Sequence, residues 1–284
     1  MWVIELVILF TLLWLMSFVF SKTSPREKLP LVNSFDFLGA KINFRILGKG
    51  LPVILLHGSM VYDPWGGFEK VLAKKHTVYW IDLPGFGGSD TVKGRLHDTD
   101  LFSECVIEFI KSQGLLKAPI ISLSLGTIVA AKLVESGHSE GKQIMVGAPG
   151  KLFGDVSRLA CYVPVFIRRW VASTEWGKKA LLIPMLRGNT GDKKGDDVRL
   201  LHNLMVTDPK SLADIDYLRE IEKEMPRVLS KIDINNIAFI YGELDNQKDT
   251  NSLIKKYFTI QGAGHSPFGS HGKELIKEVE RAGI

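Results

Sequence analysis

Cysteine is scarce in this chain of 284 residues, which contains only Cys105 and Cys161. Two cysteines are too few for a disulfide framework, so the fold must rest on its hydrophobic core. Apolar residues make up 45% of the sequence and charged residues 24%, which is ordinary for a globular protein. A sizeable core is therefore available, and this length is compatible with one α/β domain.

Long runs of basic residues are also missing. The net charge is +5, yet no run of Lys and Arg exceeds two residues, and no zinc-finger spacing occurs. Nucleic acid is therefore not a predicted partner. A negatively charged membrane surface explains the excess of basic over acidic residues more easily.

Patterns for metals and cofactors are absent from the sequence. The seven histidines are scattered, with no H-E-x-x-H motif and no paired cysteines. The glycine-rich segment "DLPGFGGSD" (82–90) lacks both the G-x-G-x-x-G spacing and a terminal Lys-Ser/Thr. We therefore expect no metal and no cofactor, and we read Asp82 and Ser89 as hydrogen-bonding structural residues.

A long apolar run is present at the N-terminus. Residues 1–20 are apolar except for Glu5, Thr11 and Ser17. As a helix they would span roughly 30 Å, the thickness of the hydrocarbon core of a bilayer. Neither a basic n-region nor a small-residue cleavage site is present, which favours an uncleaved single-pass anchor over residues 1–21. The polar linker predicted at 22–34 is basic, which places the remainder of the chain on the cytoplasmic side.

After the linker, apolar runs alternate with helical patterns. Two short alternating runs split by Gly39 predict a hairpin. Later runs predict buried strands: "PVILLHG", "TVYWIDLPG", "PIISLS", "QIMVGAP", "IAFIYGE" and "YFTIQGAG". One intervening helix places Cys105 on its apolar stripe, where a buried thiol is expected. The alternation predicts an α/β fold with a mostly parallel sheet and helices on both faces.

Residues 151–233 interrupt this alternation with helical patterns and no convincing strand. An insertion of this kind predicts a helical cap, set between two parts of the core at 35–150 and 234–284. Active sites of open α/β sheets lie at the carboxyl ends of the strands, where the cap would sit. The cap is rich in basic and aromatic residues, so it is either a lid over a pocket or a lid that also touches lipid headgroups.

Two serines in "PIISLSLGTIVAAK" (119–132) are candidate nucleophiles. A nucleophile on a strained strand-to-helix turn needs small residues two positions before and after it. Ser124 meets this requirement with Ser122 and Gly126, whereas Ser122 would have the β-branched Ile120 before it. The pattern S-x-S-x-G therefore predicts Ser124 as the nucleophile, although the pentapeptide alone is also compatible with a plain strand–helix junction.

Its partners are expected in three other loops, each directly after a predicted strand. "GELDNQKD" (242–249) offers Glu243, Asp245 and Asp249, and "GAGH" (262–265) offers His265. The chain order Ser124, Asp245, His265 is the order expected of a hydrolase on such a sheet. In "LLHGSM" (55–60), Gly58 lets the backbone turn so that the N–H groups of Ser59 and Leu125 can bind an oxyanion, while His57 is read as structural.

These motifs together resemble the α/β-hydrolase superfamily over about residues 35–284. The matching pieces are "HGSM", "DLPGFGGSD", "SLSLG", "GELD" and "GAGH". The resemblance implies Ser124 as nucleophile, Asp245 as acid, His265 as base, and the Ser59 and Leu125 amides as oxyanion donors. Ser122 departs from the family, where glycine is usual. A serine nucleophile argues against haloalkane dehalogenases and many epoxide hydrolases, which use aspartate.

The sequence thus predicts a membrane-anchored serine hydrolase that cleaves carboxylic esters, with hydrophobic or lipid-like esters favoured. Two alternatives stay open: the same residues acting on amide, thioester or carbon–carbon bonds, and a non-catalytic binding protein that keeps the fold. The oligomeric state is not predicted.

Overall fold

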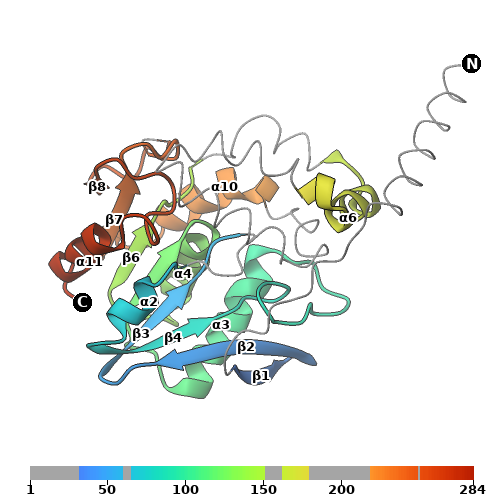
Figure 1. Cartoon of the computed structure of the whole chain (residues 1–284), viewed down its shortest axis with the longest axis horizontal. Helices are drawn as coiled ribbons and strands as arrows, with labels where there is room; N and C mark the ends of the chain where they lie inside the picture. The colour runs from blue at the N-terminus through green and yellow to red at the C-terminus, as the bar shows by residue number, and fades with distance from the viewer. Residues whose placement is uncertain (1–31, 60–64, 151–161, 179–217, 249) are drawn as a thin grey trace, which may run out of the picture.

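A computed structural model of the chain describes residues 32–59, 65–150, 162–178, 218–248 and 250–284 (Figure 1). Its centre is an eight-stranded sheet with the strand order β1-β2-β4-β3-β5-β6-β7-β8. The strands are β1 (Asn33–Phe37), β2 (Ala40–Leu47), β3 (Leu51–Leu56), β4 (His76–Ile81), β5 (Ile120–Leu123), β6 (Gln143–Val146), β7 (Ile237–Gly242) and β8 (Phe258–Ile260). The last two positions of the predicted linker already belong to β1.

The sheet is antiparallel at one edge and parallel elsewhere. β1 and β2 form the predicted hairpin, and β2 pairs antiparallel with β4, whereas the pairs from β4 through β8 are parallel. The hairpin turn uses Leu38 and Gly39, both with positive φ, and Gly39 N–H donates to Asp36 Oδ1 at 3.2 Å. Every residue of β5, β6 and β7 is buried, as expected for strands covered on both faces.

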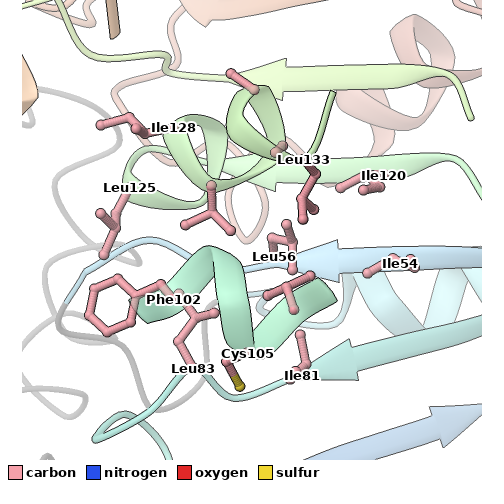
Figure 2. Packing of buried hydrophobic residues seen from close by; sticks show 14 of the residues in the cluster. Ile54, Leu56, Ile81, Leu83, Phe102, Cys105, Ile120, Leu125, Ile128 and Leu133 are labelled. Carbon is pink, nitrogen blue, oxygen red and sulfur yellow. The ribbon is translucent and has the colours of Figure 1, made fainter. Parts of the chain in front are cut away.

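Helices cover both faces of the sheet, which confirms the predicted layers. On one face lie α3 (Thr99–Gln113), α4 (Leu125–Glu135) and α10 (Leu218–Leu229), and on the other lie α2 (Phe68–Leu72) and α11 (Gly272–Arg281). Each layer has its own hydrophobic cluster. Figure 2 shows part of the first cluster, in which Phe102 and Cys105 of α3 are buried together with Leu56 and Ile81 of the sheet.

α3 shows how local sequence produces one of these helices. Asp98 caps its first turn by accepting a hydrogen bond from Leu101 N–H at 2.9 Å, and Gly114 ends it with φ of 65°. Its predicted stripe is entirely buried, and Cys105 lies on it as expected. Burial raises the pKa of the Cys105 thiol well above its usual range, so this side chain acts as a core residue.

Most of the predicted cap, and all of the predicted anchor, lie outside the described residues. Within the cap range the structure describes α6 (Val165–Ser173) and α10. α10 packs on α4: Met225, Val228 and Leu229 join the first core cluster, and Lys132 of α4 lies 3.0 Å from a carboxylate oxygen of Glu224. Over the ranges that the structure describes, no helix has both the length and the apolar character to cross a bilayer.

Candidate active site

Ser124 occupies a strained turn between β5 and α4. Its φ of 49° and ψ of −114° lie in a region that residues with a side chain rarely adopt, and it is buried. Such a conformation costs about 1–3 kcal/mol and persists only where the surroundings impose it. The turn places Ser124 at the carboxyl end of a central parallel strand, the usual position of ligands and active sites in open α/β sheets.

The small residues on either side of Ser124 have different functions. A Cβ atom on Gly126 would lie 2.4 Å from Leu56 O and 2.7 Å from His57 O, so α4 can approach β3 only with glycine here. Ser122 lies within β5, fully buried, and its hydroxyl donates to Ile144 O of β6 at 3.2 Å. Serine at 122 is therefore small enough to be buried between strands and brings a hydrogen bond that glycine could not make.

Replacing Gly126 with alanine should destabilise the protein. The added methyl group collides with two backbone carbonyls that cannot move without distorting β3, and overpacking of this kind costs about 1–3 kcal/mol. Chemical denaturation followed by circular dichroism measures the effect. Gly137→Ala is the comparison, because a Cβ atom at Gly137 meets nothing within 4 Å and tests only the cost of its positive φ. Equal stability of Gly126→Ala and wild type would contradict this account of the turn.

The structure brings Asp245 and His265 into direct contact. Nδ1 of His265 lies 3.0 Å from Oδ2 and 3.1 Å from Oδ1 of Asp245, and the side chains are 12% and 0% exposed. Their loops are joined by backbone hydrogen bonds from Glu243 N–H to Ile260 O and from Leu244 N–H to Ala263 O, both 2.9 Å. Because a carboxylate only accepts, Nδ1 carries the proton, which leaves Nε2 as the nitrogen that can accept another.

Of the two carboxylates of this loop that the structure describes, Asp245 lies against the imidazole. Glu243 is exposed, and its Oε2 accepts the N–H of Gly262 at 2.9 Å. Asp249 lies outside the described residues. Both carboxylates contact the chain after β8, but only the buried Asp245 meets the imidazole, while the exposed Glu243 binds the backbone.

Val146 and Gly147, at and directly after the end of β6, contact Ser124 and His265 respectively. Ser124 N–H donates to Val146 O at 3.0 Å, and the next residue, Gly147, lies against the imidazole. A Cβ atom at Gly147 would approach His265 Cε1 to 2.8 Å, so only glycine allows the ring this position. Sequence analysis missed this residue; the available signal was the run of small residues "GAPG" directly after a strand.

The candidate oxyanion donors flank Ser124. A Cβ atom on Gly58 would lie 3.2 Å from Ser124 Cβ, so the loop after β3 passes beside the serine. Ser59 follows in this loop and is half-buried, while residues 60–64 lie outside the described part. Leu125 is the first residue of α4, where backbone N–H groups have no partner within the helix and the helix dipole favours negative charge.

His57 engages both ring nitrogens with the backbone. Leu83 N–H donates to Nε2 at 2.9 Å, so Nδ1 carries the proton and donates to Gly58 O at 2.6 Å. Burial lowers the pKa of His57 from its usual value, although nearby Asp82 acts in the opposite direction. With both nitrogens occupied, this neutral imidazole supports the loops after β3 and β4, as its interpretation as a structural residue requires.

The glycine-rich loop after β4 is held by Asp82 and Ser89. Asp82 accepts from buried Arg45 Nη1 at 3.0 Å and from Gly88 N–H at 3.2 Å, and Ser89 Oγ donates to Asp82 O at 2.7 Å. These bonds are internal to the loop and its neighbouring strands. Across the described ranges, no three His, Cys, Asp or Glu side chains gather as a metal site would require.

Comparison with known proteins identifies the family to which this arrangement belongs. The sequence matches the model of the Alpha/beta hydrolase family over residues 53–278. The chain belongs to the α/β-hydrolase family. This confirms the predicted resemblance and the prediction of a hydrolytic enzyme built on this fold.

Individual relatives in the α/β-hydrolase family are distant in sequence. Two curated relatives are pimeloyl-[acyl-carrier protein] methyl ester esterases. The protein from Pseudoalteromonas atlantica is 24% identical over 254 residues, with 83% of this chain and 95% of its own length covered. The protein from Aeromonas hydrophila is 25% identical over 263 residues, with 82% of this chain and 95% of its own length covered. A solved α/β-hydrolase-fold protein from Burkholderia ambifaria superposes with a TM-score of 0.72 at 17% identity. The superposition covers 90% of this chain and 99% of that protein.

Proposed function

We propose that this α/β-hydrolase cleaves carboxylic esters, with Ser124 as the nucleophile. The observation that carries the proposal is the contact of His265 Nδ1 with the buried carboxylate of Asp245, which follows the carboxyl end of β7, while Ser124 occupies its strained turn at the carboxyl end of β5. A base oriented by a carboxylate is the arrangement that makes a serine hydroxyl reactive near neutral pH. Two distant relatives named as methyl ester esterases support an ester as the substrate.

The proposed reaction proceeds through an acyl-enzyme. Nε2 of His265 takes the proton of Ser124 as Oγ attacks the ester carbonyl, and Asp245 stabilises the resulting imidazolium. The oxyanion accepts hydrogen bonds from Ser59 N–H and Leu125 N–H, aided by the N-terminus of α4. The imidazolium then gives its proton to the departing alcohol. Water, deprotonated by the same nitrogen, attacks the acyl carbon and releases the acid and the free serine.

A panel of substrates tests whether the protein cleaves esters in preference to other bonds, and whether it is an enzyme at all. Wild-type protein should be labelled by a serine-directed fluorophosphonate, and it should hydrolyse carboxylic esters faster than amides, thioesters or carbon–carbon substrates with the same acyl group. Faster cleavage of one of those other bonds would reassign the reaction while keeping the nucleophile. Absence of both labelling and turnover would favour the non-catalytic binding protein.

We further propose a helical cap over residues 151–233 and hydrophobic esters as substrates. α10, at the end of the cap range, packs on α4, the helix that begins directly after Ser124. In α6 and its flanks, large aromatic side chains are exposed: Tyr162 by 78%, Phe166 by 70% and Trp176 by 45%. Arg169, which is in the same helix as Phe166, is also exposed. Aromatic and basic side chains together suit the headgroup region of a membrane.

Membrane anchoring by residues 1–21 gives a separate prediction. The apolar run is long enough to span a bilayer, and the polar segment 22–32, which ends where β1 begins, would tether the hydrolase on the cytoplasmic side. Deleting residues 1–21 should move the protein from the membrane fraction to the soluble fraction after cell lysis, with little effect on the hydrolysis of a short water-soluble ester. A matched chain with the deletion replaced by an unrelated apolar helix should stay in the membrane fraction. A full-length chain found in the soluble fraction would contradict the anchor.

A further inference from the structure

Gln247 lies fully buried in the loop that carries Asp245, against the segment that follows β6. Its backbone N–H donates to Asp245 Oδ1 at 2.9 Å. Its side-chain Oε1 accepts the N–H of Gly150 at 3.2 Å, across 97 residues of sequence. One residue thus contacts both the predicted acid and residue 150, which directly precedes the predicted cap.

The loop around Gln247 is closed by further hydrogen bonds. Thr250 donates to Gln247 O through both its N–H, at 3.2 Å, and its hydroxyl, at 2.7 Å. Gly150 comes so close that a Cβ atom there would lie 2.4 Å from Thr250 Oγ1. The side chain of Gln247 therefore joins two segments that are already in close contact.

The other end of segment 147–150 supports His265. Gly147 N–H donates to Ile240 O, and Tyr241 Oη donates to Ala148 O, both at 2.9 Å. Gly147 in turn lies against the imidazole ring. Through this segment, Gln247, whose N–H binds the carboxylate of Asp245, is connected to the glycine against which the ring of His265 lies.

We propose that Gln247 is a positioning residue for Asp245 and His265. Its side chain fixes the Asp245 turn to segment 147–150, so that the carboxylate faces Nδ1 of the ring that rests on Gly147. This inference builds on the proposed function. Glutamine suits the position chemically: leucine would leave the Gly150 N–H without its acceptor, asparagine is shorter by one methylene, and glutamate would add a second carboxylate beside Asp245.

Kinetics of Gln247→Leu test the role. Loss of the Gly150 hydrogen bond should loosen the Asp245 turn and lower kcat by about 10- to 100-fold while KM changes little, because misplacement of a catalytic group acts mainly on the chemical step. The acid limb of the pH profile of kcat/KM should move to lower pH, since a poorly placed carboxylate stabilises the imidazolium less. Gln247→Glu keeps the acceptor and adds negative charge, so its acid limb should move to higher pH.

Gln143→Leu is the matched control. Gln143 is also a buried glutamine with side-chain hydrogen bonds, to Ser139 Oγ and Gly141 O, but it lies at the opposite end of β6 from the site. The variant should lose comparable stability in thermal denaturation and keep the wild-type kcat and acid limb. Equal losses of kcat in both leucine variants, with unmoved acid limbs, would overturn the positioning role. So would wild-type kinetics in Gln247→Leu.

A spectroscopic measurement separates this inference from the proposed function. The Nδ1 proton of His265 should give a far-downfield resonance in proton NMR, assigned by its loss in His265→Ala. It should broaden or disappear in Gln247→Leu and persist in Gln143→Leu and Gln247→Glu. Should Gln247→Leu fail to fold, the acid limb of Gln247→Glu decides, and an unmoved limb overturns the inference. If the wild type hydrolyses no ester but its resonance depends on Gln247 as described, the proposed function fails and the positioning role stands.

Discussion

Ser124→Ala should lower kcat for ester hydrolysis on the order of 10⁶-fold and abolish labelling by a fluorophosphonate. The alanine removes the only atom that can form the acyl-enzyme, while the strained turn and the pair of Asp245 and His265 stay in place. Residual turnover above the uncatalysed rate would come from substrate binding and the oxyanion donors alone. Steady-state kinetics and gel fluorescence of the labelled protein measure the two effects.

Ser122→Ala is the control for this substitution. It removes a hydroxyl from the neighbouring small residue, leaves the turn at Ser124 intact and deletes one buried hydrogen bond to Ile144 O. That loss costs about 0.5–1.5 kcal/mol of stability, and labelling and kcat should stay close to wild type. If Ser124→Ala were still labelled and Ser122→Ala were not, the assignment of the nucleophile would be reversed.

Asp245→Asn should lower kcat about 10⁴-fold with little change in fold. The asparagine amide can turn its NH₂ group toward His265 Nδ1, which favours the tautomer with the proton on Nε2. In that tautomer Nε2 cannot accept the proton of Ser124, so attack on the carbonyl loses its base. The deficit should shrink at high pH, where the serine hydroxyl ionises more readily and depends less on a base.

Glu243→Gln provides the comparison from the same loop. Its carboxylate is exposed and contacts the Gly262 N–H rather than the imidazole, so kcat should stay within a few-fold of wild type. Both variants should unfold at similar denaturant concentrations, which separates catalysis from stability. A larger loss of kcat in Glu243→Gln than in Asp245→Asn would transfer the role of the acid to Glu243.

Much of the fold could be predicted because its signals are local. The continuous apolar runs became β3, β5, β6 and β7, since strands buried on both faces consist mostly of apolar side chains. The apolar stripe of α3 was predicted from the spacing of apolar residues at the period of an α-helix. The hairpin was predicted from two runs of alternating apolar and polar residues on either side of Gly39. The segment at 151–233 had weaker signals, and its boundary is harder to draw because α10 packs on the core.

The candidate site was predictable to the extent that its residues follow strands. Chain order and small neighbours led to Ser124, Asp245 and His265 as the prediction, and the structure places the latter two in contact. Gly147, Gly150 and Gln247 were missed, since a glycine that admits an imidazole and a glutamine that joins two loops leave no periodic pattern. Their importance lies in contacts with residues about 100 positions away.

The sequence by itself determined the family, the alternation of strands and helices and the turn chemistry around Ser124, because each depends on neighbouring residues. Only the tertiary structure decided the strand order β1-β2-β4-β3-β5-β6-β7-β8 and the carboxylate that faces the imidazole. It also showed that both nitrogens of His57 are engaged, and that the carbonyls of Leu56 and His57, at the end of β3, leave room only for glycine at position 126. These features depend on which distant segments pack together, and packing is set by the whole core rather than by any one segment.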